Sequence, residues 1–298
     1  MIAQPPGNVD ESTKLRCVSC GADNVDRGGF CFRCMTPLEL SRSVAARGTP
    51  ARFVSVLGAS AAGKTVYLGF LMDVLSKGSR GLRGIPNGSF SVAMQQQTMS
   101  ALQHRRFPEK TPSEADSFRW VHCEVAHGKR HNNHLDIITP DFAGEAIAIE
   151  VEQPGTYETI RSAVSNSGAL MILIDSHRAR DAGRDEDFFA MKLASYIHNL
   201  HSQGGAKRKR LTLPIAIVFT KADSCTEAML NPSEFATSNL PGLVNCCERN
   251  FRHYSFFASG VVGSCATYVS EHGVQIRIPL HIEPHGIIEP LEWITKRL

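Results

Sequence analysis

The residues with the most specific chemistry in this chain are the eight from Gly58 to Thr65, which read GASAAGKT. They fit the phosphate-binding pattern G-x-x-x-x-G-K-[ST]. An apolar run rich in β-branched residues precedes them, and apolar residues at helical spacing follow them. Strand, loop and helix therefore occur in the order that the pattern requires. The plain alternative is a turn of small residues, but such a turn leaves the lysine without a role.

Each position of this loop has a predicted function. Gly58 and Gly63 let the backbone curl so that main-chain N–H groups and a helix N-terminus face the phosphates. Lys64 is expected to reach the β- and γ-phosphates, and Thr65 is expected to ligate Mg²⁺. The predicted nucleotide contacts of the loop are Gly58, Ala61, Ala62, Gly63, Lys64, Thr65 and Val66.

A second motif lies in residues 134–145, where an apolar strand is predicted to end at Asp141 and Gly144 completes a D-x-x-G pattern. We expect the aspartate to hold the Mg²⁺ shell and the glycine N–H to sense the γ-phosphate. Taken alone the pattern also fits an ordinary turn. Its place at the C-terminal end of a strand, downstream of a phosphate-binding loop, favours the functional interpretation.

Strands and helices alternate along the rest of the chain. Buried strands are predicted over residues 168–175 and 213–220, with an amphipathic helix near 187–202 between them. This alternation is typical of a parallel sheet covered on both faces. We therefore expect an α/β fold, a three-layer P-loop NTPase domain with a mostly parallel central sheet. An extra helix over 91–107 is a candidate lid or partner-binding surface, and a terminal helix is expected in 285–298.

The strand over 213–220 runs directly into Thr220, Lys221, Ala222 and Asp223. These residues resemble the [NT]-K-x-D base-recognition signature of Ras-like GTPases. The resemblance implies that the aspartate accepts from guanine N1–H and the 2-amino group, and that the lysine packs over the base. Adenine has an acceptor at N1 and lacks the 2-amino group, so such a carboxylate selects guanine. A solvated loop is the alternative, and three motifs in the correct order argue against it.

From Arg52 to the C-terminus the chain resembles the Ras-like (TRAFAC-type) P-loop GTPases, and within them the second type of the bacterial double-GTPase family. The resemblance implies GTP and GDP as ligands, Mg²⁺ as cofactor, and a place in bacterial conflict or defence gene neighbourhoods. It also implies a last base-contacting loop, which we assign to residues 256–262 with Ser259 and Gly260 beside the guanine. The usual S-A-K spelling of that loop is absent.

The same family places a threonine between the phosphate loop and Asp141 that closes over Mg²⁺. Thr111 is our candidate, and an ordinary Thr-Pro turn is an equal alternative. Ras-like enzymes carry glutamine after the D-x-x-G glycine, whereas this chain carries Glu145. A glutamate can accept a hydrogen bond from water but cannot donate one, and it adds negative charge beside phosphate. With Lys64, Thr111, Gly144 and Glu145 as its catalytic residues, the site is predicted to hydrolyse GTP slowly.

An arginine that stabilises the transition state adds about 10³–10⁵ to the rate of such enzymes. Arg105 and Arg106 are candidates, with solvated arginines at a helix end as the alternative.

A separate metal centre is predicted near the N-terminus, where CVSC and CFRC stand ten residues apart. Two C-x-x-C turns supply the tetrahedral sulfur shell that structural Zn²⁺ prefers, and four thiolates leave no open position for catalysis. The segment is too short to bury a sufficient core, so zinc is expected to supply its folding free energy. Chance cysteines in a loop are the alternative. The predicted ligands are Cys17, Cys20, Cys31 and Cys34.

We thus expect a zinc ribbon over residues 1–40, a linker over 41–51 rich in Ser, Ala, Arg and Gly, and a GTPase domain over 52–298. The five later cysteines are expected to be reduced. Two other clusters have plain interpretations. The histidines of 127–134 fit a hairpin turn better than a metal site, and the basic run 207–210 fits a solvated loop better than a phosphate or nucleic-acid contact.

Composition narrows the class of protein. The 298 residues are 42% hydrophobic, which excludes a fully disordered chain. No apolar run approaches the roughly 20 residues of a membrane span, and the first residues lack the order of a secretory signal, so a cytoplasmic location is expected. The 32 basic and 29 acidic residues leave a net charge of +3, too little for a global nucleic-acid or membrane footprint.

Together these features predict a GTP-controlled switch that hydrolyses GTP slowly and acts on a protein partner. The first alternative is a nucleotide-binding scaffold without hydrolysis. The second is a zinc-ribbon protein that binds nucleic acid under nucleotide control. An ATP-dependent phosphotransferase is disfavoured by TKAD.

Overall fold

The computed structural model describes residues 14–26, 28–48, 52–108, 119–128, 133–141, 144–182, 184–202, 210–269, 273 and 275–298. The chain divides into two units, Met1–Ala51 and Arg52–Leu298, which we call unit 1 and unit 2. Each unit has buried apolar clusters of its own. Among the described residues, no helix combines the length and apolar character that a membrane span requires.

Unit 1 is a small module built around its cysteines. Strands β1 (Lys14–Arg16) and β2 (Asp23–Val25) form an antiparallel pair, and helix α1 (Leu38–Ala46) follows. Its buried cluster consists of three of the cysteines and Leu38. With so few apolar groups, burial alone gives this unit little folding free energy.

Helix α1 belongs to unit 1 and includes part of the segment expected as a linker over residues 41–51. Ser41 and Val44 are buried within this helix. The main-chain N–H of Val18 donates to the Ser41 hydroxyl at 3.0 Å, and Arg42 pairs with Asp26 at 2.7 Å. Small and basic residues in this segment therefore pack and pair as a helix. The division of the chain into zinc ribbon, linker and GTPase domain stays a proposal.

Unit 2 is built on a seven-stranded sheet. Its strand order is β4-β5-β6-β3-β7-β8-β9, parallel from β6 to β9 and antiparallel at β4 and β5. This confirms the mostly parallel sheet. The strands are β3 (Phe53–Gly58), β4 (Arg83–Asn87), β5 (Trp120–His127), β6 (Asn133–Pro140), β7 (Ala169–Asp175), β8 (Ile215–Thr220) and β9 (Tyr254–Ala258).

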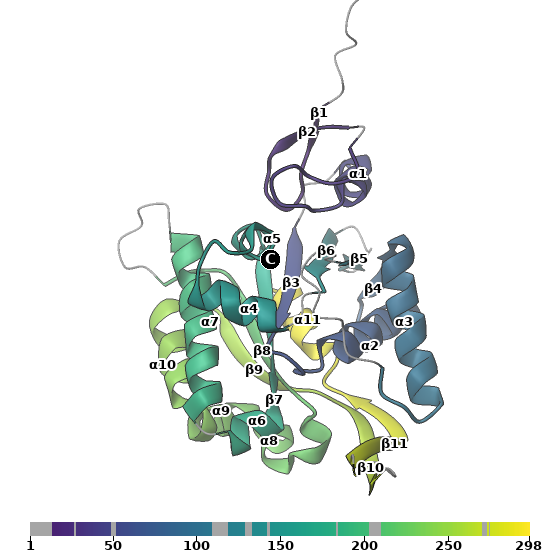
Figure 1. Ribbon diagram of the computed structural model, residues 1–298, viewed down its shortest axis with the longest axis vertical. Coiled ribbons are helices and arrows are strands. Elements are labelled where there is room, and N and C mark those ends of the chain that lie inside the picture. Colours follow the sequence, from purple (N-terminus) through teal and green to yellow (C-terminus); the bar gives the residue numbers. More distant parts are fainter. Residues whose placement is uncertain are drawn as a thin grey trace, which may run out of the picture. The chain divides into compact units, whose positions relative to one another are not determined.

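The central strands β3, β7 and β8 are buried along their whole length because helices cover both faces of the sheet. Side chains alternate between two cores, so that Val56 joins one cluster and Leu57 the other. Figure 1 shows α2 and α3 on one side of the sheet, and α4, α7 and α10 on the other. The three-layer α/β fold is thus confirmed.

The helices of the first layer are α2 (Lys64–Lys77), α3 (Gly88–Gln103) and α11 (Glu289–Thr295). Helix α3 is the extra helix expected from the sequence, and it packs against α2. The other layer contains α4 (Gly144–Glu152), α5 (Glu158–Ser165), α6 (Ser176–Asp181), α7 (Arg184–Ser202), α8 (Thr226–Leu230), α9 (Pro232–Asn239) and α10 (Pro241–Asn250).

A two-stranded hairpin lies outside the central sheet and was not predicted from the sequence. It consists of β10 (Gly260–Val269) and β11 (Gln275–His285), paired antiparallel. The hairpin begins one residue after Ser259 and packs on the short 3-10 helix Ala222–Ser224. It therefore lies beside the TKAD motif.

Candidate functional site

A pocket of about 700 Å³ lies at the C-terminal ends of the parallel strands. Its position agrees with the rule that open α/β sheets bind ligands beyond the carboxyl ends of their strands. Its size is within the range of small-molecule sites. The predicted site residues that line it are Gly58, Ala61, Ala62, Gly63, Lys64, Thr65, Val66, Gly144, Glu145, Thr220, Lys221, Asp223 and Ser259.

Lys64 is the cation at the phosphate end of this pocket. Its side chain is only 8% exposed, and its Nζ lies 3.4 Å from Asp141 Oδ1 and 3.4 Å from the Pro140 carbonyl oxygen. Burial lowers the pKa of Lys64, and the charge of Asp141 acts against that shift. The carboxylate thus favours the charged form of a buried ammonium where phosphate oxygens are expected.

The loop that precedes Lys64 is held in a curled shape. Ala61 and Gly63 have φ of 60° and 77°, in the left-handed region. The Thr220 hydroxyl donates to the carbonyl oxygens of Ala62 at 2.8 Å and Ile174 at 3.2 Å. Thr220 was predicted as a nucleotide contact. In the structure its hydroxyl fastens the phosphate loop to β7, while the residue itself lines the pocket.

The D-x-x-G segment meets the phosphate loop at Ser60. Asp141 directly follows β6, as expected, and it is buried. A Cβ added at Gly144 would lie 1.8 Å from the Ser60 nitrogen, so only glycine fits there. The Ser60 hydroxyl donates to Glu145 Oε1 at 2.6 Å. Glu145 therefore lies beside the loop that is expected to hold the phosphates.

Two hard oxygen donors at this end fit a magnesium site. Thr65 lines the pocket, and Asp141 lies next to Lys64. A hydroxyl and a carboxylate that leave other positions to water and phosphate are the donor set Mg²⁺ prefers. Thr111, the third predicted magnesium residue, lies outside the described residues.

At the opposite end, Asp223 faces the pocket from the turn after β8. Burial raises its pKa, and hydrogen bonds from main-chain N–H groups, including that of Val261, act in the opposite direction. A Cβ added at Gly260 would lie 2.8 Å from Asp223 Oδ1. Gly260 does not line the pocket, but its missing side chain lets the β9–β10 turn approach the carboxylate.

The lysine of TKAD is held by an ion pair, since Lys221 Nζ lies 2.5 Å from Asp175 Oδ2. The Ser259 N–H donates to the Phe219 carbonyl at 2.7 Å, and the Ser259 carbonyl accepts from the Ala222 N–H at 3.1 Å. The predicted base loop thus joins the TKAD turn through main-chain bonds. The absence of an S-A-K motif does not prevent this connection, because the hydrogen bonds involve only main-chain atoms.

Sequence reasoning missed several pocket residues. Phe107 and Pro108 line it from beyond α3, and Arg277 reaches it from β11. The charge of Arg277 lowers the pKa of Asp223, a smaller effect than burial. Nothing in the local sequence marks these residues, since only the tertiary fold brings them to the pocket.

The two arginines proposed as candidates for catalysis do not line the pocket. Arg105 and Arg106 close the end of α3 through main-chain bonds to Leu102 and Ala101. They are exposed, in agreement with the alternative of solvated arginines at a helix end.

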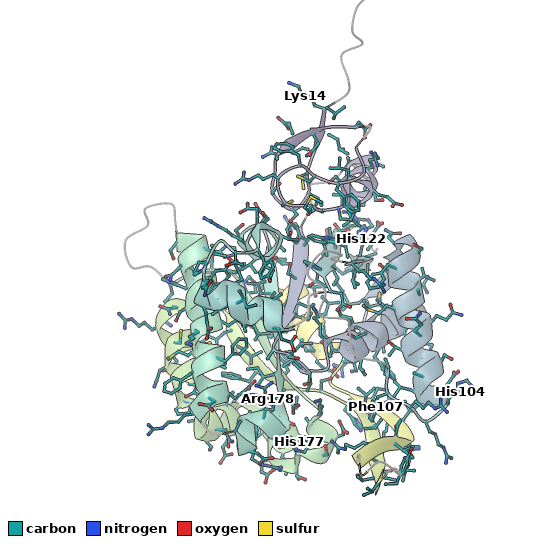
Figure 2. All side chains as sticks on the ribbon, viewed as in Figure 1. Lys14, His104, Phe107, His122, His177 and Arg178 are labelled. Atoms are coloured by element: carbon teal, nitrogen blue, oxygen red, sulfur yellow. The ribbon has the colours of Figure 1, made fainter. Side chains whose placement is uncertain are left out.

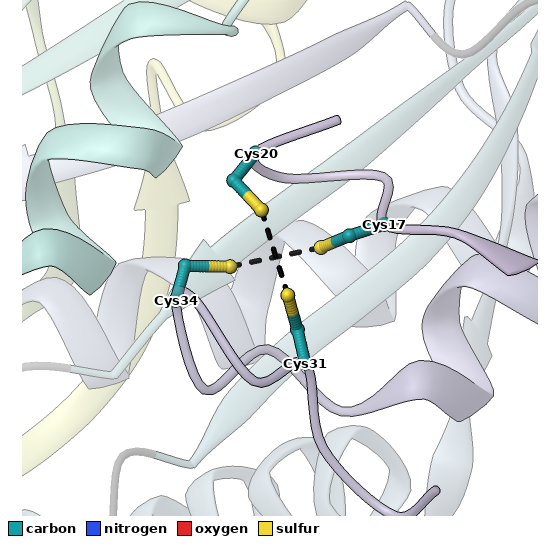
Figure 3. A group of neighbouring side chains, drawn as sticks. All are labelled: Cys17, Cys20, Cys31 and Cys34. Carbon is teal, nitrogen blue, oxygen red and sulfur yellow. Dashed lines mark hydrogen bonds between the residues drawn. The ribbon is translucent and has the colours of Figure 1, made fainter. Parts of the chain in front are cut away.

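The four N-terminal cysteines meet as one cluster, with their sulfur atoms within 4.8 Å of one another. Figure 3 shows the side chains converging on one point. Zinc–sulfur bonds of about 2.3 Å in a tetrahedron place sulfurs about 3.8 Å apart. Here Cys17 and Cys34 are separated by 3.6 Å, and Cys20 and Cys31 by 3.5 Å. The cluster therefore fits a Zn²⁺ ion.

The thiols of this cluster also influence one another. The hydrogen bond from Cys34 lowers the pKa of Cys17 to about 5, while burial raises that of Cys20 to about 11. The five other cysteines are free thiols, as expected.

Comparison with known proteins gives one family match. The family model described as Double-GTPase 2 matches residues 52–267. No curated protein matches the chain.

Three solved structures illustrate the fold comparison. Nucleolar GTP-binding protein 1 of Plasmodium falciparum is 13% identical, with 84% of this chain and 87% of that chain covered and a TM-score of 0.41. The Ski7 GTPase-like domain of S. cerevisiae, bound to GDP and inorganic phosphate, is 15% identical over 86% and 51%, with a TM-score of 0.44. The SRb–GTP/SRX complex of Chaetomium thermophilum is 14% identical over 72% and 93%, with a TM-score of 0.39.

Proposed function

Because the chain belongs to the Double-GTPase 2 family, we propose that unit 2 is a slow, Mg²⁺-dependent GTPase that acts as a nucleotide-controlled switch. Family membership supports GTP binding. The observation that carries the proposal is that Lys64, Gly144 and Asp223, which are far apart in the sequence, line one pocket. A cation for phosphates and a carboxylate for a base at two ends of one pocket suit a nucleotide.

The base end supports guanine. The Asp223 carboxylate is half-buried and already hydrogen-bonded to main-chain N–H groups, which fix its direction. Guanine offers N1–H and the 2-amino group to such an acceptor, whereas adenine presents no donor at these positions. We infer that Asp223 selects guanine, with Lys221 over the base and Ser259 and Gly260 shaping the turn beside it.

The phosphate end supports a triphosphate with a metal ion. Lys64 would bind the β- and γ-phosphates, while Thr65 and Asp141 would hold Mg²⁺, Asp141 through its shell. When bound, Mg²⁺ neutralises charge on the phosphate oxygens. The main-chain N–H groups of residues 60–65 would complete the phosphate contacts.

Glu145 supports slow turnover. Its carboxylate lies on Ser60, within the segment that would face the γ-phosphate. There it can accept a hydrogen bond from the attacking water, but it has no N–H to donate to a phosphate oxygen. Its negative charge also opposes the charge that accumulates there.

The contact between Gly144 and Ser60 supports a switch. Gly144 packs so closely on Ser60 that an added Cβ would lie 1.8 Å from the Ser60 nitrogen. We infer that a γ-phosphate bound beside that nitrogen would displace the segment. GTP and GDP would then hold residues 144 and 145 differently and present different surfaces to a protein partner. A role in a bacterial conflict or defence system is part of this proposal and rests on the family resemblance alone.

We also propose that Cys17, Cys20, Cys31 and Cys34 hold one structural Zn²⁺ in unit 1. Four thiolates complete the coordination shell, so the ion would stabilise the fold rather than catalyse.

Single-turnover hydrolysis of radiolabelled GTP tests the proposed activity. We expect slow, Mg²⁺-dependent release of phosphate that is lost in Lys64→Ala. Glu145→Gln should be several-fold faster because the amide removes the charge and adds a donor, whereas Lys77→Ala, an exposed change on the same helix, should match the wild type. Tight GTP binding with no hydrolysis by the wild type would instead indicate a nucleotide-binding scaffold.

A further inference from the structure

Arg178 contacts the phosphate loop at Ser60. It lies on α6, directly beyond the end of β7 (Figure 2). Its Nη1 donates to the Ser60 carbonyl oxygen at 3.2 Å. The side chain is 46% exposed, so part of the guanidinium is open to solvent. A partly exposed cation is thus attached to the loop that would hold the γ-phosphate.

A buried carboxylate holds this guanidinium in place. Arg178 Nη2 lies 2.8 Å from Glu186 Oε2, and Glu186 is only 1% exposed. Glu186 is in the first turn of α7, a long helix packed on the sheet. Burial raises the pKa of Glu186, and the charge of Arg178 acts against that shift. The carboxylate gives Arg178 a fixed anchor behind the phosphate loop.

The backbone before Arg178 is also fixed. The Asp175 carboxylate accepts from the His177 N–H at 2.9 Å and caps α6. The same carboxylate pairs with Lys221 of the TKAD turn. The position of α6 is therefore tied to both ends of the nucleotide pocket.

Ser60 joins two opposite charges. Its carbonyl accepts from Arg178, and its hydroxyl donates to Glu145. Glu145 brings negative charge to the expected position of the γ-phosphate, where it opposes hydrolysis. An arginine on the same residue offsets that charge and supplies the donors that Glu145 lacks.

The geometry points to Arg178 as the arginine, supplied in cis, that neutralises the γ-phosphate during hydrolysis. This inference rests on the proposed GTPase function. In the reaction the water oxygen bonds to the γ-phosphorus. The bond to the β–γ bridging oxygen breaks and its electron pair stays on GDP, while the proton lost by the water is released to solvent as inorganic phosphate forms. Negative charge grows on the bridging and γ-oxygens, and the Arg178 guanidinium stabilises it.

Other arginines are placed less favourably. Arg178 is not itself among the residues that line the pocket, but it bonds to the phosphate loop at Ser60. Arg105 and Arg106 instead close the end of α3, and Arg277 acts on Asp223 at the base end. Arg180 comes from the same helix as Arg178, but it is exposed and pairs with Asp181. Arg180 is therefore a matched control for a change of Arg178.

The test compares Arg178→Ala, Arg178→Lys, Glu186→Gln and Arg180→Ala in the full-length protein. Single-turnover GTP hydrolysis should fall about 1,000-fold in Arg178→Ala. Lysine lacks the planar guanidinium with its paired donors, so Arg178→Lys should hydrolyse GTP almost as slowly as Arg178→Ala. Glu186→Gln keeps the shape of the side chain but removes the charge that pairs with Arg178. In this variant the rate of hydrolysis should fall by a smaller factor. Arg180→Ala should equal the wild type.

Two further readouts distinguish a catalytic from a structural role. GTP and GDP affinities should change less than about threefold in Arg178→Ala, whereas binding of GDP with aluminium fluoride, a mimic of the transferring phosphoryl group, should be lost. Equal losses of GTP affinity and rate would indicate a structural role and overturn the inference.

The outcomes also separate this inference from the proposed function. Hydrolysis that is present in the wild type and unchanged in Arg178→Ala would overturn the role of Arg178 alone. No hydrolysis by the wild type would overturn both.

Discussion

The cysteine cluster of unit 1 and the nucleotide pocket of unit 2 differ in how far apart in the sequence their residues lie. The four cysteines of unit 1 lie within eighteen residues and need only two tight turns to meet. The nucleotide pocket of unit 2 draws on strands, turns and a hairpin spread over more than two hundred residues. In unit 1 the proposed zinc ion would stabilise the fold. In unit 2 the large buried clusters on the sheet stabilise the fold, and the pocket does not depend on a ligand.

This difference implies that damage to the two sites has different consequences for folding. Removing zinc should unfold unit 1, because its few buried apolar groups cannot replace the metal. Removing a nucleotide contact from unit 2 should weaken binding while the two apolar clusters keep the fold. The predictions below test this contrast in order of expected effect.

The largest effect is expected from Cys17→Ser combined with Cys20→Ser. Structural zinc contributes about 10–16 kcal/mol in small modules, so unit 1 should lose its protection against hydrogen exchange. Elemental analysis should find about one zinc per wild-type chain and none in the variant. Cys246→Ser on α10, a change outside both the cluster and the nucleotide pocket, serves as the control. GTP affinity of the double variant should stay within about twofold of the wild type, and a large loss would mean that the two units do not act independently.

Lys64→Ala should produce the next largest effect. The substitution removes the buried ammonium and leaves Asp141 without this partner. Charge-assisted hydrogen bonds contribute about 1.5–3 kcal/mol each, so two phosphate contacts predict a loss of about 100-fold or more in GTP affinity. Calorimetry gives the constant, with Lys77→Ala as the control. Undiminished GTP binding in Lys64→Ala would contradict the assignment of the phosphate end.

Lys221→Ala should have a smaller effect at the base end. A cation packed over an aromatic ring contributes about 0.5–2 kcal/mol, which corresponds to a loss of about two- to thirtyfold in affinity. GTP and GDP should be affected by the same factor because they share the base. A loss confined to GTP would place Lys221 at the γ-phosphate instead.

The smallest effect near neutral pH is expected from titration of Asp223. Its pKa is raised above the ordinary value of 3.8 because of burial. The charged carboxylate is the form that accepts both guanine donors, so guanine preference should be full at neutral pH and fall as pH decreases through the raised pKa. The ratio of GDP to ADP affinity isolates this change, because the two ligands carry the same phosphates. A ratio that rises on acidification would contradict the role of Asp223.

The sequence predicted the parts of the site that depend on neighbouring residues. The phosphate loop, Asp141, Gly144 and the TKAD turn each follow a strand whose apolar character is visible locally. Their meeting in one pocket follows from the parallel sheet, since the carboxyl ends of parallel strands share an edge. The zinc cluster was predicted for a similar reason, because its spacing is short.

Contacts between distant side chains could not be predicted in this way. Arg178 and Arg277 have ordinary local sequences. Arg178 bonds to Ser60, which is 118 residues away in the sequence. Arg277 on β11 acts on Asp223, which lies in the turn after β8. The β10–β11 hairpin was missed although it begins within the predicted base loop, at Gly260. Thr220 was assigned to the base from its motif position, but its hydroxyl bonds to the phosphate loop.

Base selectivity is the most direct test of the account. Calorimetry should compare GTP, GDP, ATP and XTP with Mg²⁺ for the wild type and for Asp223→Asn. The account predicts guanine preference in the wild type and a shift toward xanthine in the variant, since an amide donates to the oxygen that replaces the 2-amino group. Preference of the wild type for ATP, or no binding of any nucleotide, would contradict a guanine site in this pocket.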